Sequence, residues 1–286
     1  MVRRRISRRT LLKRCVTGMV GAGLLGVGGI EYGRLVEPRW IAIEPIRLTL
    51  PRLAPAFHQY RVAQISDLHM GDWMNRARLE EVVRHLNEQQ ADLVAITGDF
   101  VTREAETSAQ DLIEVLRTLR ARDGVVAVLG NHDHWSNPDI IREALRQSSL
   151  RNLDNGVVTL ERGAALLHIA GVDDVWERQD RLDKVLATLP AEGAAMLLAH
   201  EPDFADVSAA TGRFDLQISG HSHGGQVIVP FRGPLRLPPY GRKYPVGRYQ
   251  VGRMIQYTNR GVGMLWPYVR VNCRPEITVF TLESRG

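Results

Sequence analysis

The sequence predicts an α/β fold in which helices connect the strands of a parallel sheet. Short apolar runs alternate with amphipathic segments over residues 61–147, in the order strand, helix, strand, helix, strand. Apolar residues make up 44% of the 286-residue chain and charged residues 24%, the composition of a globular protein that buries a core. Polar residues gather directly after the predicted strands, which is the edge where open α/β sheets bind ligands.

Residues 41–147 are predicted to hold an extended segment, strands and helices in alternation. The extended segment is expected at 41–50 and the strands at 61–67, 92–98 and 125–129; the helices are expected at 75–90, 109–120 and 137–147. In the first helix, Leu79, Val82, Val83 and Leu86 recur at the i, i+3, i+4, i+7 spacing of one face. Asn137 is a suitable N-cap for the last helix, because Pro138 then occupies its first turn.

The second half of the chain is predicted to be richer in strands. A hairpin is expected at 156–160 and 165–170, a helix at 180–189, and buried strands at 195–199 and 216–219. The C-terminal part is expected to form strands within 226–230, 248–258 and 276–282.

The net charge of +5 originates in the N-terminal residues. Residues 1–30 carry seven Lys and Arg and no Asp or Glu, so residues 31–286 hold 30 basic against 32 acidic residues. Nucleic-acid binding needs a basic surface on the folded domain, and it is therefore not expected.

The same N-terminal residues predict export. The string Ser7-Arg8-Arg9-Thr10-Leu11-Leu12-Lys13 precedes an uncharged apolar run, Cys15 to Ile30, and resembles a twin-arginine signal. An ordinary secretory signal or a short N-terminal anchor is the alternative, because a spanning helix needs roughly 20 apolar residues. Export by the twin-arginine route would place the protein in the periplasm or at the outer face of the cytoplasmic membrane. Whether the leader is cleaved stays open.

Polar clusters follow five predicted strands. They are Asp67-Leu68-His69, Gly98-Asp99, Gly130-Asn131-His132-Asp133, His200, and Gly220-His221-Ser222-His223. The chain has two cysteines, so a cysteine-rich zinc site is excluded, and a metal must be held by His, Asp, Glu or Asn. Carboxylate and imidazole ligands suit Zn, Fe and Mn, and a pair of such ions can clamp a phosphoryl group during displacement.

The order D-x-H, G-D, G-N-H-D, H, G-H-x-H resembles the calcineurin-like metallophosphoesterase superfamily, and in particular its twin-arginine-exported bacterial envelope branch. The resemblance covers about residues 60–283. It implies a four-layer α/β/β/α sandwich of two mixed sheets flanked by helices. The catalytic domain is expected at 38–286, after a signal or anchor and linker at 1–37.

The resemblance also implies roles for the polar clusters. Asp67, His69 and His223 would hold a first divalent ion, Asp99 would bridge, and Asn131, His200 and His221 would hold a second ion, with Mn, Zn or Fe as the candidates. His132 would face the scissile phosphate and protonate or stabilise the leaving oxygen, while Asp133 would orient its loop.

These roles predict a phosphoesterase, with phosphodiesters as the expected substrates and metal-hydroxide attack as the reaction. The protein phosphatases of the superfamily carry G-D-x-V-D-R-G, whereas this chain has Thr102 at the second aspartate, so a phosphoprotein substrate is not expected. One alternative is a metal-holding protein that binds a phosphate-bearing lipid or wall polymer without turnover. Another is a lipid-directed pyrophosphatase that resembles UDP-diacylglucosamine hydrolases.

Residues 230–243 predict a loop, because four prolines and two glycines prevent a regular helix. The loop mixes apolar residues with Arg232 and Arg236, a composition that suits contact with anionic lipid headgroups, including those of a lipid-linked substrate. A packed surface loop with solvated arginines is the alternative. Arg242, Lys243 and Arg260 are the candidates for binding substrate phosphate.

Overall fold

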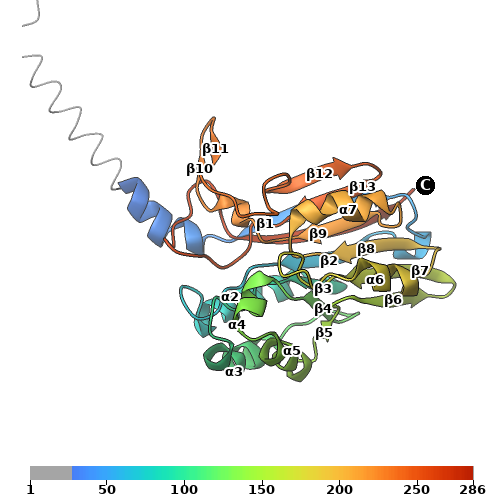
Figure 1. The fold of residues 1–286 in the computed structure, drawn as a ribbon, viewed down its shortest axis with the longest axis horizontal. Coiled ribbons are helices and arrows are strands. Elements are labelled where there is room, and N and C mark those ends of the chain that lie inside the picture. The colour runs from blue at the N-terminus through green and yellow to red at the C-terminus, as the bar shows by residue number, and fades with distance from the viewer. Residues whose placement is uncertain (1–27, 286) are drawn as a thin grey trace, which may run out of the picture.

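The computed structural model describes residues 28–285, which form two six-stranded mixed sheets stacked face to face (Figure 1). The strand order is β1-β14-β2-β3-β4-β5 in the first sheet and β12-β13-β9-β8-β7-β6 in the second. Helices cover the outer faces, with α3 and α5 on one side of the molecule and α7 on the other. The predicted four-layer α/β/β/α sandwich is therefore confirmed.

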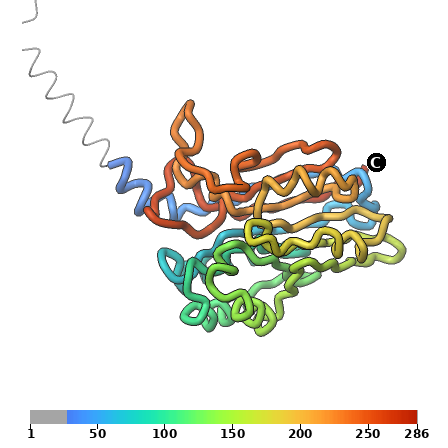
Figure 2. Tube along the Cα trace, viewed as in Figure 1, coloured from blue at the N-terminus to red at the C-terminus, as the bar shows by residue number. Residues whose placement is uncertain are grey.

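The first sheet and its helices use residues 42–152 and 276–284. Its strands are β1 Ala42–Leu50, β2 Tyr60–Ile65, β3 Leu93–Thr97, β4 Val125–Val128, β5 Arg151–Asn152 and β14 Glu276–Ser284; its helices are α2 Arg76–Glu88, α3 Ala105–Leu116, α4 Asn131–Ser136 and α5 Pro138–Gln147. Strands β1 and β14, from opposite ends of the chain, pair in parallel and run side by side in Figure 2.

The second sheet uses residues 156–258. Its strands are β6 Gly156–Arg162, β7 Ala165–Gly171, β8 Ala194–Leu198, β9 Leu216–Ser219, β12 Gly247–Val251 and β13 Met254–Thr258, and its helices are α6 Leu182–Thr188 and α7 Ala205–Ala210. Strands β10 Ile228–Val229 and β11 Gly233–Pro234 form a separate small hairpin, and single 3-10 turns lie at Glu37–Arg39, Pro55–Phe57, Pro202–Phe204 and His223–Gly225.

Three apolar layers hold the four structural layers together. Along β3, Leu93 and Ala95 face the second sheet, while Val94 and Ile96 face the helices, as the two-residue period of a strand requires. The central layer joins residues of both sheets, and the outer layers join each sheet to its own helices. Every strand that carries a predicted ligand is thus buried on both faces.

Most predicted elements are confirmed with small changes at their ends. Asn137 caps α5 by accepting a hydrogen bond from the Ile140 amide. Helix α3 begins at Ala105, four residues before the prediction, because the small side chains of Ala105 and Ser108 extend its buried face. Helices α4 and α7 were not predicted, since both are six residues long and have no periodic apolar face.

The leader and its twin-arginine string lie outside the described residues, so export stays a prediction. The described chain opens with a helix at 28–35 whose Gly33 carbonyl accepts a hydrogen bond from the Arg270 amide. Glu37 accepts another from the Cys273 amide at 2.5 Å, so residues before 38 contact the domain. Across residues 28–285, every helix is too short or too polar to cross a membrane.

Candidate metal centre

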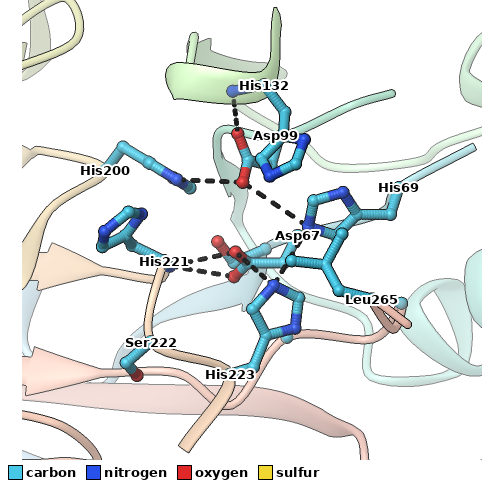
Figure 3. A network of polar contacts seen from close by, with 12 residues as sticks. Asp67, His69, Asp99, His132, His200, His221, Ser222, His223 and Leu265 are labelled. Carbon is cyan, nitrogen blue, oxygen red and sulfur yellow. Dashed lines mark hydrogen bonds and ion pairs between the residues drawn. The ribbon is translucent and has the colours of Figure 1, made fainter. Parts of the chain in front are cut away.

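The carboxyl ends of the parallel strands bring the first ligand cluster together. Asp67 and His69 follow β2, Asp99 follows β3, and His223 follows β9 in the other sheet. One candidate ligand atom from each of these four residues lies within 4.8 Å of the others. His69 Nε2 is 3.0 Å from His223 Nε2 and 3.5 Å from Asp99 Oδ2. All four side chains are buried, so both sheets contribute to one enclosed cluster (Figure 3).

A second cluster shares the carboxylate of Asp99. Its other members are His200, which follows β8, and His221, which follows β9, and the three ligand atoms again lie within 4.8 Å. Nδ1 of His200 donates to the Thr97 carbonyl at 2.6 Å. This hydrogen bond turns Nε2 toward Asp99, and Nε2 lies 3.2 Å from Asp99 Oδ2. His221 Nε2 donates to the Pro239 carbonyl at 2.8 Å, which leaves Nδ1 as the ligand atom. These outer hydrogen bonds fix the ring orientations.

The donor set fits two divalent ions. Asn131 Oδ1 and His200 Nε2 are buried and have no hydrogen-bond partner within residues 28–285. Asn131 opens α4 directly after Gly130, which packs against Asp99 and His200, so its oxygen belongs with the second cluster. Two imidazole nitrogens that face each other at 3.0 Å need a proton or a cation between them. All seven predicted ligands thus lie at one edge of the sandwich.

The backbone at the ligands is strained. Asp67, His69, Asp99, His221 and His223 all have positive φ angles, between 51° and 69°. Residues with a Cβ adopt this left-handed conformation uncommonly and at a cost of order 1–3 kcal/mol, and such outliers cluster at functional sites. The strand-end loops therefore turn sharply at these five ligands.

Two glycines allow the loops to approach one another. A Cβ at Gly98 would lie 2.6 Å from His200 Nδ1 and 2.8 Å from the Gly130 nitrogen, and φ there is +90°. A Cβ at Gly220 would overlap Ser66 and Asp67. A side chain at either position would separate the two sheets at the metal edge.

Two further residues hold the ligand loops in place. Asp133 accepts hydrogen bonds from the amides of Phe100 and Gly130, at 2.8 and 3.0 Å, and so joins the loops of Asp99 and Asn131 as expected. Arg270 is fully buried and donates to the carbonyls of residues 260, 261, 263 and 273, at 2.7–3.1 Å. Arg270 thereby holds the loop at 260–263, whose Gly263 amide donates to the Asp67 carbonyl at 2.7 Å. Nothing in the local sequence distinguishes Arg270 from a surface arginine, so its role was not predicted.

His132 lies beside both clusters and is not part of either. Its amide donates to Asp99 Oδ1 at 2.9 Å, and its Nδ1 donates to the Thr102 carbonyl at 2.8 Å, so Nε2 is left for another partner. Figure 3 shows His132 next to Asp99 and His69. Trp135 and Trp176 extend a row of rings that starts at His132. The ring centroids of His132 and Trp135 are 4.8 Å apart, and those of the two tryptophans are 5.2 Å apart.

The basic residues predicted to bind phosphate are placed differently from one another. Lys243 Nζ pairs with Asp206 at 2.7 Å, and Arg260 pairs with Glu276 at 2.5 Å and Glu44 at 2.6 Å. The side chain of Arg242 is exposed. Two of the three cations are thus neutralised by carboxylates, and their contact with substrate stays a prediction.

Burial sets the protonation of the ligands in the metal-free protein. Burial raises the pKa of Asp67 to about 7, with the charge of Asp99 adding to it, and burial lowers the pKa of His69 to about 3. Burial alone would lower the pKa of His200 as well. The charge of the adjacent Asp99 carboxylate outweighs this effect and raises the pKa of His200. The neutral imidazole of His69 is the form that binds metal, whereas Asp67 and His200 must lose protons first.

Comparison with known proteins identifies a matching family model and related sequences. The family model for calcineurin-like phosphoesterases matches residues 60–225. An uncharacterized metallophosphoesterase of Bacillus subtilis, YkuE, is 34% identical over 98% of this chain and 99% of its own length. The phosphodiesterase YaeI of Escherichia coli is 29% identical over 97% of this chain and 99% of its own length. Among solved structures, the sulfate thiohydrolase SoxB of Thermus thermophilus is 15% identical, with a TM-score of 0.47 over 80% of this chain and 57% of that one.

Metal affinity is expected to fall as the pH drops below 7. Binding must displace the proton that Asp67 holds below its pKa of about 7, and also the proton on His200, so each further pH unit weakens affinity at least about tenfold. The stability of the metal-free protein depends on pH in the opposite direction. The raised pKa of Asp67 stabilises the folded state at low pH, and this contribution is lost as the pH rises from about 4 to about 7. Calorimetric Mn²⁺ titrations between pH 5.5 and 8 measure the first effect, and an affinity independent of pH below 7 would contradict it.

Proposed function

The chain belongs to the calcineurin-like phosphoesterase family and is therefore a metal-dependent phosphoester hydrolase, and we propose that it hydrolyses phosphodiesters in the cell envelope. The observation that carries this proposal is the pair of ligand clusters that share Asp99, with His132 alongside. Bound there, two divalent ions would neutralise charge on the phosphate and lower the pKa of a water.

His132 is positioned to serve the leaving oxygen. The Thr102 carbonyl accepts the proton on Nδ1, which orients the ring and leaves Nε2 directed away from that carbonyl. A proton carried on Nε2 would then be donated to the oxygen on which charge develops as the ester bond breaks. A protein that only held metal and bound a phosphate-bearing lipid would have no use for this imidazole beyond the ligand set.

The surroundings of His132 favour a diester over a monoester. A diester phosphate carries one negative charge, whereas a monoester carries nearly two at neutral pH and needs additional cations. Lys243 and Arg260 are already paired with carboxylates, and the wall next to His132 is formed by Trp135 and Trp176. An apolar wall suits the second organic group of a diester. The name of the Escherichia coli relative, a phosphodiesterase, supports the same choice.

Replacing His132→Ala is expected to leave both metal ions bound and to lower diester hydrolysis by about 10²–10⁴-fold, the usual effect of removing a general acid. The ligand clusters do not include its side chain, so metal content should stay that of the parent. Metal analysis together with rates on diester, monoester and pyrophosphate-linked substrates makes the measurement. His85→Ala, which removes an imidazole from the outer surface of α2, is the matched control. Parental turnover in a metal-replete His132→Ala protein would contradict the assignment of His132 as the general acid.

The envelope location rests on the leader. Paired arginines a few residues before an uncharged apolar run are the address of the twin-arginine route, which carries folded proteins. Folding before export suits this protein, because its ligands come from both sheets and assemble only in the folded state. The phosphoester substrate would then lie outside the cytoplasm.

Changing Arg8→Lys together with Arg9→Lys is expected to stop export, because the pair is recognised as an address and not as charge. Cell fractionation with antibody detection measures the location of the protein. Arg3→Lys with Arg4→Lys makes the same chemical change outside the motif and should be exported normally. If the Arg8 and Arg9 double variant still leaves the cytoplasm, the general secretory route is the better account.

A further inference from the structure

Three segments that are distant in sequence form one surface at the end of the molecule where the described chain begins. They are the helix at 28–35, the β10–β11 hairpin, and residues 265–274 (Figures 1 and 2). Arg270 donates its amide to the Gly33 carbonyl, and the Ile228 amide donates to the Val271 carbonyl. We refer to residues 28–40, 226–236 and 264–274 as the docking face.

Large apolar side chains concentrate on the docking face. Of the twelve that are exposed in the described part of the chain, eight lie here, among them Ile30, Leu35, Trp40, Phe231, Leu235 and Trp266. Phe231, at the tip of the hairpin, is fully exposed, and Trp266 is 81% exposed. Single exposed apolar residues are ordinary on protein surfaces, but a cluster of this kind marks an interaction site.

The docking face also carries unpaired positive charge. Arg34, Arg39, Arg232 and Arg236 are exposed, and none forms an ion pair with a carboxylate of residues 28–285. Residues 226–236 and 264–274 contain no Asp or Glu. Within 28–40, Glu37 is buried against the Cys273 amide, which leaves Glu31 as the one exposed acid of the three segments. Apolar and aromatic side chains among cations complement an anionic lipid surface.

The sequence continues this pattern upstream. The uncharged apolar run from Cys15 ends at Ile30, inside the helix that opens the docking face. Stable membrane attachment commonly requires two signals, such as an apolar anchor and a basic patch. The run and the docking face would meet the same bilayer.

The docking face adjoins the metal centre. Gln226 exchanges two hydrogen bonds with the backbone of Leu265, at 3.0 and 2.7 Å, and Cys273 Sγ donates to the His223 carbonyl at 3.2 Å. Figure 3 shows Leu265 close to His223, and the exposed Trp266 is the next residue. A bilayer against this face would hold the metal edge close to lipid headgroups.

We propose that the docking face binds the surface of an anionic phospholipid bilayer. The docking face lies on the bilayer surface. Within residues 28–285, its apolar residues come from the helical residues 28–35, a hairpin of two short strands and a loop, and none of these crosses a bilayer. The inference stands apart from the choice of diester substrate, because hydrolysis of a small soluble diester does not require it.

Tryptophan quenching in the full chain tests the proposal. Vesicles of brominated phosphatidylglycerol and phosphatidylcholine should quench the fluorescence of Trp40 and Trp266, and Trp40→Phe with Trp266→Phe should abolish that quenching. Trp73→Phe, which removes a half-buried tryptophan next to Arg78, is the control and should keep it. All variants retain the leader, so any vesicle binding by the leader itself is the same in every variant and does not affect the comparison. Vesicle binding without quenching of Trp40 and Trp266 would overturn the proposal, and would show that the leader alone attaches the protein.

The basic residues give a second measurement. Each basic residue near an anionic surface strengthens binding about fivefold, so Arg232→Gln with Arg236→Gln should reduce the preference for anionic over zwitterionic vesicles roughly 25-fold. Arg232→Lys with Arg236→Lys should retain it. An unchanged preference in the Gln variant would contradict the role of the hairpin. Soluble-diester hydrolysis should be parental in every variant, so its loss would count against the proposed function and not against the docking face.

Discussion

The carboxylate of Asp99 is the element on which the rest of the structure depends, because it belongs to both ligand clusters. Each cluster combines residues from the two sheets: Asp67 and His69 meet His223 in one, and Asp99 meets His200 and His221 in the other. The stacking of the sheets therefore sets the geometry of the metal centre. The apolar layer between the sheets positions ligands as well as stabilising the domain.

This arrangement is costly in the absence of metal. Buried imidazoles face one another, Asn131 Oδ1 has no partner among the described residues, and five ligands have left-handed backbones. Asp133 and Arg270 hold the loops by bonding to their backbones, so the ligands stay assembled despite the strain. Metal binding would convert these unsatisfied groups into coordinated ones, which couples metal loading to the stability of the folded protein.

The sequence predicts the fold, and it predicts which polar residues lie together at the sheet edge, because both depend on local patterns. The alternation of strands and amphipathic helices predicts β2, α2, β3, α3, β4 and α5, and the polar residues after each strand predict the members of the two candidate ligand clusters. The left-handed turns, the buried Arg270 and the helix α4 depend on contacts between segments far apart in the chain, and no periodic signal marks them. Lys243 and Arg260 show the same limit, since their acidic partners lie far away in sequence.

Electron paramagnetic resonance of the Mn²⁺-loaded protein tests the shared carboxylate most directly. If Asp99 bridges two sites, two equivalents of Mn²⁺ bind about 3.5–4 Å apart, and the fully loaded protein gives the spectrum of an exchange-coupled pair. A spectrum of isolated Mn²⁺ ions at full loading, or saturation at one equivalent, would contradict a centre built around Asp99.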